Sequence, residues 1–262
     1  MTPRVAVLMP TIGERPQQVS EFFQSMNKYY PDTPVYGCVQ DGPVPGNWAG
    51  VIDLPELIGP HQARLTAFRQ FRDHADVWIV VDDELIVTHK TRWQPAVQKA
   101  QQPGVGIVSC NWARSTKQIR NRDTPDTYLK QIIVYTGGGM AISTQVLNEI
   151  EEDTGHLTRP VCDNTTWSMS TYLNGRTNYR YRGSLAINQA STVGGLRTYL
   201  KQAETEWHLQ PFIDRRPTKH HTYDHPEANY CIPQDQDVNQ KAKRLHQQTR
   251  RTRFQHSDSG TR

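Results

Sequence analysis

The 262-residue chain lacks the features that mark membrane-spanning, secreted and zinc-binding proteins. It has no run of about 18 apolar residues, and its first residues lack the apolar core of a secretion signal. Its cysteines form no Cys-x-x-Cys pair, so they indicate buried free thiols rather than a zinc ribbon or a redox motif. The cysteines are Cys38, Cys110, Cys162 and Cys231. We therefore expect a cytoplasmic protein without a membrane partner.

Hydrophobic residues are also scarce, at 35% of the chain with a mean hydropathy of −0.73. So polar a chain places part of its length outside a compact core. Residues 241–262 hold seven Lys or Arg and one Asp, a formal charge of +6, whereas residues 1–240 hold 23 basic and 25 acidic residues, a formal charge of −2. This basic tail suits contact with nucleic-acid phosphates, but a purely solubilising role explains it equally well.

Strand-like and helix-like segments alternate along the first 110 residues. Apolar strand-like runs occupy 4–16, 34–42, 77–87 and 104–112. Apolar residues at three- and four-residue steps predict helices over 19–30, 61–76 and 93–100. The Pro and Gly residues of 42–60 predict a loop there. Such alternation is typical of an α/β fold with a mostly parallel sheet and helices on its faces.

The pattern weakens after residue 110. Strands are expected in 131–143 and 179–189, and helices in 144–155 and 167–175. We divide the chain into an α/β domain over 1–215, with halves 1–110 and 111–215, a His- and Pro-rich segment over 216–240 and an extended basic tail over 241–262.

Polar residues stand where three expected strands end, after Pro10, at Gln40-Asp41-Gly42 and at Asp82-Asp83-Glu84. Ligands of parallel α/β sheets bind at these carboxyl ends, so the three groups should face one crevice. Three adjacent acids after a buried strand suit a hard divalent cation, because Mg²⁺ and Mn²⁺ prefer oxygen ligands. Strand alternation would place Asp82 and Glu84 on one face and Asp83 on the other. A water-exposed strand end without metal is the alternative.

Four short motifs follow one another over residues 4–90. They are Pro10-Thr11-Ile12-Gly13-Glu14-Arg15, Asp41, Gly59-Pro60-His61-Gln62-Ala63-Arg64 and Asp82-Asp83-Glu84. Their order resembles the GT-A family of nucleotide-sugar-dependent glycosyltransferases, particularly the inverting family-2 type. In that family the corresponding motifs are a Pro-Thr-x-x-Arg-like loop, an Asp that reads the nucleobase, a Gly-x-x-x-Ala-Arg helix signature and the D-x-D metal motif.

The resemblance implies a GT-A, Rossmann-like fold in which 1–110 binds the nucleotide sugar and 111–215 the acceptor. It implies a metal-dependent transfer of sugar from a nucleoside-diphosphate sugar, most simply a UDP-sugar, to a hydroxyl acceptor. The donor-binding candidates are Pro10, Thr11, Arg15, Asp41, Arg64, Asp82 and Asp83. Asp82 and Glu84 would hold Mn²⁺ or Mg²⁺, with His220 as a further ligand, although a surface His cluster without metal also explains His220.

The resemblance is fainter downstream. Gly137, Gly138 and Gly139 would allow an acceptor to approach the backbone closely, or would form a strand bulge, and Trp167 would lie on the same acceptor side. Asp163 matches the general base of an inverting reaction, although Cys162 replaces the usual Glu and a helix N-cap is the alternative role. The rival bases are Glu151, Glu152 and Asp153.

A basic tail joined to such an enzyme suggests one acceptor, DNA with hydroxymethylated bases, as in bacteriophage DNA-glucosylating enzymes that act in the host cytoplasm. Two alternatives stay open. A nucleotidyltransferase would share the sheet but usually has a Gly-x-Gly-x-Arg loop, whose paired glycines the Pro10 loop lacks. A non-catalytic nucleic-acid-binding protein would use only the tail. A metal-dependent thermal shift with UDP would separate the enzyme from the binding protein.

Overall fold

The computed structural model describes residues 2–56, 58–113, 129–132, 139–155 and 163–188. Cys162, Gly137, Gly138, His220 and the basic tail therefore lie outside the described residues. Among the described helices none is long and apolar enough to cross a membrane.

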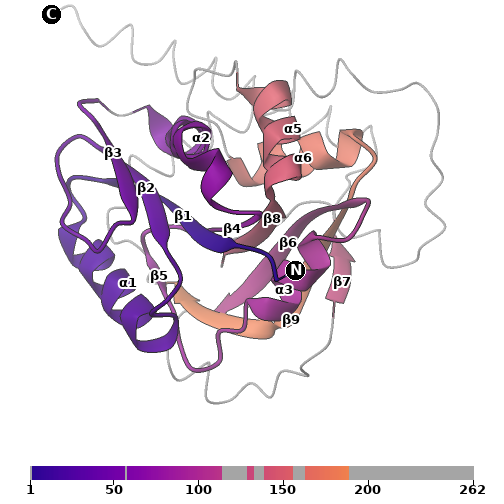
Figure 1. The fold of residues 1–262 in the computed structure, drawn as a ribbon, viewed down its shortest axis with the longest axis horizontal. Helices are drawn as coiled ribbons and strands as arrows, with labels where there is room; N and C mark the ends of the chain where they lie inside the picture. The colour runs from indigo at the N-terminus through magenta and orange to yellow at the C-terminus, as the bar shows by residue number, and fades with distance from the viewer. Residues whose placement is uncertain (1, 57, 114–128, 133–138, 156–162, 189–262) are drawn as a thin grey trace, which may run out of the picture.

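A nine-stranded sheet runs through the molecule, with the order β3-β2-β1-β4-β8-β6-β9-β5 and with β7 paired to β9 (Figure 1). The strands are β1 (Val5–Ile12), β2 (Val35–Gln40), β3 (Gly50–Leu54), β4 (Val77–Val80), β5 (Leu85–Ile86), β6 (Val105–Ala113), β7 (Leu129–Ile132), β8 (Met140–Ser143) and β9 (Thr177–Asn188). The helices are α1 (Pro16–Tyr29), α2 (Gly59–Phe71), α3 (Gln94–Ala100), α5 (Thr144–Thr154) and α6 (Asp163–Leu173), and Arg72–His74 adds a 3₁₀ turn.

The first four strands run parallel, because β1 pairs in parallel with both β2 and β4, and β2 pairs in parallel with β3. The β8 strand is antiparallel to both of its neighbours, β4 and β6. The mostly parallel α/β fold expected from the sequence is therefore confirmed, with an antiparallel strand in its centre. The carboxyl ends of β1, β2 and β4 lie at one edge of the sheet.

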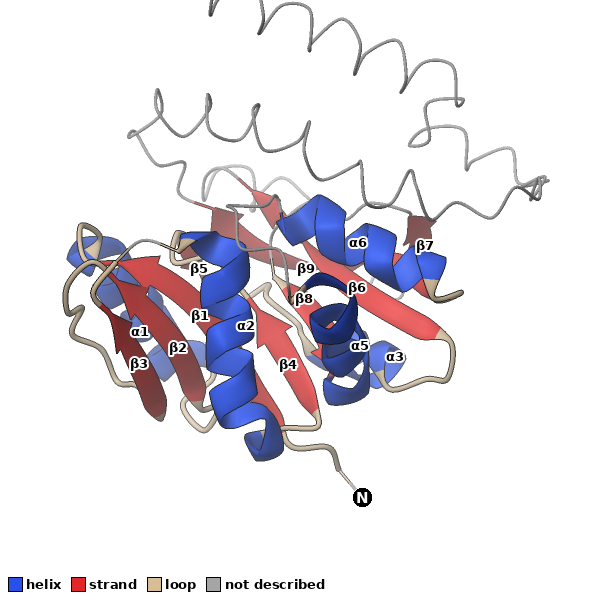
Figure 2. Cartoon of the chain, turned by 90° about the horizontal axis from the view of Figure 1, so that it is seen from above, coloured by secondary structure: helices blue, strands red, loops and turns tan. Residues whose placement is uncertain are grey.

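Two apolar layers cover the sheet, as the alternation of side chains in β1 shows. Val7 and Met9 belong to the layer under α1 and α3, whereas Ala6 and Leu8 belong to the layer under α2, α5 and α6. Figure 2 shows α2, α5 and α6 together on one face. These four side chains are completely buried. Burial of a side chain such as Leu8 contributes about 1.5–3 kcal/mol to the stability of the fold.

Three details differ from the sequence expectation. Strand β3 lies inside the expected loop 42–60, where it adds to the sheet edge beside β2. The expected strand 77–87 divides into β4 and β5, because the amide of Leu85 turns back to donate to the carbonyl of Asp82 (3.1 Å). The expected strand 131–143 likewise divides into β7, which pairs with β9, and β8, which pairs with β4.

Both cysteines among the described residues, Cys38 and Cys110, are buried free thiols, as the sequence predicts. Burial raises the pKa of each thiol to about 12, so neither is ionised near neutral pH. These cysteines fill space in the core and are poor nucleophiles.

An ion pair joins α5 to the start of β9. Arg176 Nε donates to Glu149 Oε2 (2.5 Å), a second guanidinium nitrogen contacts Oε1, and Arg176 Nη1 donates to the carbonyl of Val105 (3.1 Å). The hydrogen bonding and charge of Arg176, with a weaker contribution from the Gln145 side chain, hold the pKa of the Glu149 carboxyl below its ordinary value against the opposing effect of burial. The carboxylate is the form that the fold stabilises.

We therefore expect Glu149→Gln to lower the free energy of unfolding at neutral pH by about 1 kcal/mol. Because the folded-state pKa is the lower one, this stabilisation is present above the ordinary value of 4.5 and disappears as pH falls through the folded-state pKa. Urea unfolding at about pH 7 and about pH 3 measures both effects. Glu152→Gln, an exposed change on the same helix, is the control. An equal loss in Glu149→Gln at both pH values would contradict this assignment.

Candidate functional site

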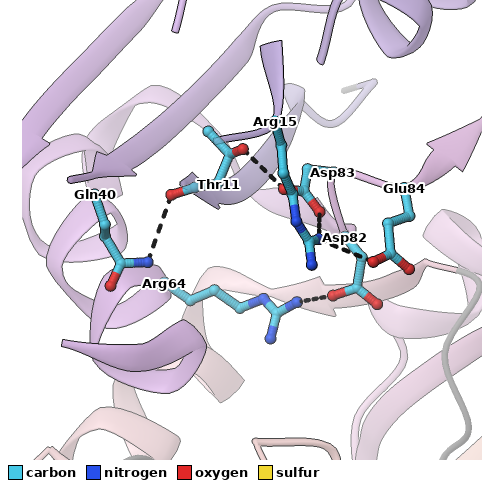
Figure 3. Close-up of polar contacts among 7 residues, drawn as sticks. All are labelled: Thr11, Arg15, Gln40, Arg64, Asp82, Asp83 and Glu84. Atoms are coloured by element: carbon cyan, nitrogen blue, oxygen red, sulfur yellow. Dashed lines mark hydrogen bonds and ion pairs between the residues drawn. The ribbon is translucent and has the colours of Figure 1, made fainter. Parts of the chain in front are cut away.

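The three acids of the candidate site fan out from a turn that follows β4. The amide of Val81 still donates to the carbonyl of Leu8 (3.0 Å), which continues the β1 pairing, and the bond from Leu85 to Asp82 then closes the turn. The three acids therefore come after the end of β4, in the turn that leads to β5. Each carboxylate is fixed by the partner that it meets (Figure 3).

Asp83 points into the protein, where its side chain is 6% exposed. Thr11 Oγ1, from the end of β1, donates to its Oδ2 (2.8 Å), and Arg15 Nη1, from the residue before α1, donates to its Oδ1 (2.8 Å). Burial raises the pKa of the Asp83 carboxyl, whereas the Arg15 charge and the hydrogen bond from Thr11 act in the opposite direction. Asp83 thus holds the β1–α1 loop to the end of β4.

Glu84 shares this arginine. The same Arg15 Nη1 donates to Glu84 Oε1 (2.9 Å), and the Glu84 side chain is 12% exposed. Burial alternates across the three acids, with Asp83 buried between the partly exposed Asp82 and Glu84, as the expected arrangement requires. The shared arginine nevertheless joins Glu84 to Asp83.

Asp82 is the most accessible of the three acids, because 44% of its side-chain surface is exposed. Its Oδ1 contacts Nη2 of Arg64, whose side chain is only 2% exposed and comes from the middle of α2. A buried guanidinium thus fixes one edge of an otherwise open carboxylate. The exposed part of this carboxylate is a suitable oxygen ligand for a cation.

Gln40, the last residue of β2, positions the helix that carries Arg64. Its Oε1 accepts hydrogen bonds from the amides of Ile58 (2.9 Å) and Gly59 (3.0 Å), which are at the amino-terminal end of α2. These amides have no partner inside the helix, so Gln40 acts as a cap from another element. From the sequence, Gln40 is predicted only to be a polar residue at a strand end. Its position directly before Asp41 was the available signal.

Asp41 lies at the exposed end of β2 and has φ 57°, the one positive φ of a described residue other than glycine. The amide of Gly13 donates to the carbonyl of Gln40 (2.8 Å), and the amide of Asp41 donates to the carbonyl of Leu54 (3.0 Å). The first bond brings the β1–α1 loop against the end of β2, and the second joins that end to β3. The remaining donor candidate, Pro10, is buried within β1 opposite Cys38.

Trp167 lies in the core, not on the acceptor surface that the sequence predicts. Its side chain is completely buried, and its Nε1 donates to Nδ1 of His61 (2.9 Å), which leaves the His61 Nε2 to donate to the carbonyl of Thr154 (3.2 Å). This chain of hydrogen bonds ties α2, α5 and α6 together. His61 lies within the Gly59 to Arg64 motif, yet sequence analysis gave it no role.

The structure describes some of the other candidates for the acceptor side and the general base. Gly139 has φ 95°, and a Cβ added there would lie 3.5 Å from Cγ1 of Val81, directly before the acids. Asp163 is the first residue of α6, and its side chain lies outside the described part. The rival base Asp153 instead accepts hydrogen bonds from Ser170 Oγ (2.7 Å) and Asn174 Nδ2 (2.8 Å).

The other two rival bases lie on the same helix, α5. Glu151 accepts a hydrogen bond from Arg69 Nε (2.6 Å), and Glu152 is exposed. Within the described ranges no three His, Cys, Asp or Glu side chains are already gathered as a metal cage.

No protein-family model and no curated protein matches this sequence. Solved structures do match. A mannosyltransferase from Pyrobaculum calidifontis, in complex with GDP-Man and Mn²⁺, matches 82% of this chain with a TM-score of 0.56 and 15% identity. GalNAc-T7, with UDP, GalNAc and Mn²⁺, matches 73% of it with a TM-score of 0.57 and 13% identity.

The fold is of the GT-A type. This confirms the fold that the order of the sequence motifs predicts. The chain spans 64% of the mannosyltransferase chain and 44% of the GalNAc-T7 chain. At these identities the likeness shows the fold alone, and the chemistry has to be argued from this chain's own residues.

The close approach at Gly13 gives a test of the site's architecture. A Cβ added at Gly13 would lie 2.0 Å from the backbone oxygen of Asp41, which no side chain can tolerate without moving one of the two segments. We expect Gly13→Ala to lower the free energy of unfolding by about 1–3 kcal/mol, the usual range for overpacking. Urea unfolding measures the loss, and amide NMR shifts should report displacement of Asp41.

Gly104→Ala is the control, because an added Cβ there meets no atom within 4 Å and only its positive φ of 74° opposes the change. This substitution should cost about 1 kcal/mol. A Gly13→Ala protein as stable as the unsubstituted chain would show that the loop and Asp41 are not in contact.

Proposed function

We propose that the chain is a metal-dependent glycosyltransferase that moves a sugar from a nucleoside-diphosphate sugar to a hydroxyl acceptor. One observation carries the proposal. Asp82 presents a half-exposed carboxylate, fixed by the buried Arg64, at the carboxyl edge of a GT-A sheet. Both structural neighbours contain a nucleotide and Mn²⁺, which supports the same chemistry for this fold.

The residues present fit a hard divalent cation. Mg²⁺ is usually bound by one or two carboxylates together with waters and substrate phosphates, rather than by a complete protein cage. Asp82 supplies the accessible carboxylate, and Glu84, two residues later in the same turn, is the second candidate. When bound, the ion would neutralise charge on the departing diphosphate. His220 stays a prediction, since it lies outside the described residues.

The chain's own residues would hold the donor on the β1 and β2 side of this ion. Asp41 is exposed beside the Gly13 loop, in the place where a nucleobase could be recognised. Arg64 orients Asp82, so the ligand loses little conformational freedom when the ion binds. Thr11 and Arg15 fix Asp83, which makes Asp83 a support for the loop rather than a donor contact.

Asp163 is the proposed general base, because it begins α6 and matches the base position of inverting enzymes. It would take the proton of the acceptor hydroxyl as attack proceeds. Gly137 to Gly139 are the proposed acceptor-side backbone, whereas Trp167 contributes only by packing α6 against His61.

A UDP-sugar as donor and a hydroxymethylated DNA base as acceptor stay predictions. The DNA proposal depends on the charge of 241–262 alone, and those residues lie outside the described part. The GT-A match favours glycosyl transfer over nucleotidyl transfer, because both structural neighbours named above carry a sugar or sugar nucleotide.

Asp82→Asn tests the metal site with little change in volume. The amide oxygen can still accept from Arg64, but it loses the charge that holds a divalent cation, so we expect Mn²⁺-dependent binding of UDP or GDP to weaken at least about tenfold. Isothermal titration with each nucleotide, with and without Mn²⁺, measures the change. Asp53→Asn, at an exposed position of the edge strand β3, is the matched control. Unchanged Mn²⁺-dependent affinity in Asp82→Asn would reject the assignment.

Asp163→Asn tests the base. Donor binding should persist, while transfer should fall by about 10²–10⁴-fold, which is the usual contribution of general-base catalysis. Release of nucleoside diphosphate from a panel of nucleotide sugars measures turnover and identifies the donor. Asp53→Asn, the same chemical change at an exposed position of β3, is the control and should leave turnover unchanged. Normal turnover in Asp163→Asn would assign the role to another carboxylate.

A further inference from the structure

Arg15 is a buried cation that contacts two of the three acids. Its side chain is 7% exposed, and one nitrogen, Nη1, lies 2.8 Å from Asp83 Oδ1 and 2.9 Å from Glu84 Oε1. Neighbouring carboxylates in a poorly solvated place repel each other strongly, so a shared counter-ion is required for both to stay charged. The structure therefore supplies that counter-ion from the protein itself.

Arg64 plays a different part on the other side of the turn. It contacts only Asp82 among the three acids, and it leaves that carboxylate 44% exposed. Arg15 instead contacts Glu84, the acid that would supply a second metal contact. The Glu84 side chain is 12% exposed. Of the two candidate ligands one is thus open and the other is already paired with a cation.

The charge balance of these five side chains predicts weak attraction for a free cation. Three carboxylates and two guanidinium groups leave one negative charge in excess. A divalent ion that approached Glu84 would also be repelled by Arg15 at short range. A nucleoside diphosphate brings additional negative charge, and its oxygens would provide the ligands that the protein withholds.

The position of the Arg15 loop would couple the two binding events. The amide of Arg15 donates to the carbonyl of Ile12 (3.1 Å), which closes a turn that contains Gly13. The amide of Gly13 in turn donates to the carbonyl of Gln40, at the end of β2 beside Asp41. A nucleotide that contacts Asp41 would therefore lie against the loop that carries Arg15. Coupling between two ligands is reciprocal, so each should tighten the binding of the other.

We propose that Arg15 is an internal counter-ion for Glu84 that holds the metal affinity low until a nucleoside diphosphate is bound. This inference depends on the proposed function, because it concerns the same metal site. The role of Arg15 is positioning and charge compensation, and Arg15 keeps the acidic turn folded when no ion is present.

Titration of the full chain with Mn²⁺ tests the role of Arg15. Electron paramagnetic resonance measures the free Mn²⁺, first without nucleotide and then with UDP or GDP. The unsubstituted chain should bind Mn²⁺ weakly alone and at least about tenfold more tightly with nucleotide. Arg15→Gln should bind Mn²⁺ alone at least about tenfold more tightly than the unsubstituted chain, with a smaller gain from nucleotide. Arg15→Lys keeps the charge and should retain the dependence.

Two further variants keep the test decisive. The double substitution Arg15→Gln with Asp83→Asn removes the carboxylate that would be left buried and unpaired, so it keeps the test available if the single variant does not fold. Arg4→Gln removes the same charge from an exposed pair with Asp76 at the other end of β1, and should leave Mn²⁺ binding unchanged. Thermal unfolding confirms that each variant is folded.

The outcomes separate the two proposals. Nucleotide-dependent Mn²⁺ binding in the unsubstituted chain, with no gain in nucleotide-free affinity in either Arg15→Gln protein, would overturn the role of Arg15 and leave the proposed function standing. Tight nucleotide-free Mn²⁺ binding by the unsubstituted chain would do the same. Absence of Mn²⁺ binding in every protein, with either nucleotide, would overturn both.

Discussion

Charge compensation at the end of β4 is the constraint around which the candidate site is arranged. Three consecutive acids follow a strand whose residues are buried, and two buried arginines contact them, Arg15 from the residue before α1 and Arg64 from within α2. Removing one partner of a buried ion pair typically destabilises a protein by about 3–5 kcal/mol, because the other charge is left uncompensated. Arg15 and Arg64 therefore link the start of α1 and the middle of α2 to the centre of the sheet.

The two arginines divide the acids into a closed part and an open part. Asp83 and Glu84 are held around Arg15, and this cluster fixes the β1–α1 loop to the end of β4, while the amide of Gly13 bonds the same loop to the end of β2. Asp82 is held on one side only and faces solvent on the other. A site for a phosphate-bound cation needs both parts, a rigid frame and one accessible ligand. The GT-A sheet brings them together because the ends of β1, β2 and β4 share one edge.

The sequence predicts the sheet and the order of its motifs, but not the directions of its side chains. Alternating apolar runs and helical spacing suffice for α1, α2 and β1, because burial on two sheet faces imposes those periods. Strand β3 cannot be predicted from its sequence, because it lies among prolines and glycines and, as an edge strand, buries little apolar surface. The fan of acids depends on the turn from Asp82 to Leu85, and the burial of Trp167 depends on His61, more than 100 residues away. The contacts that hold these side chains, from Arg15 to Asp83 and from Trp167 to His61, join distant parts of the sequence and leave no local pattern.

In the proposed site, Asp82 binds a cation that bridges the chain to a nucleoside diphosphate. A crystal of the full chain grown with Mn²⁺ and UDP or GDP, measured at the manganese absorption edge, tests it most directly. We expect an anomalous peak about 2 Å from a carboxylate oxygen of Asp82, in contact with the diphosphate. A bound nucleotide with no manganese at Asp82, or with Asp82 turned wholly onto Arg64, would contradict it.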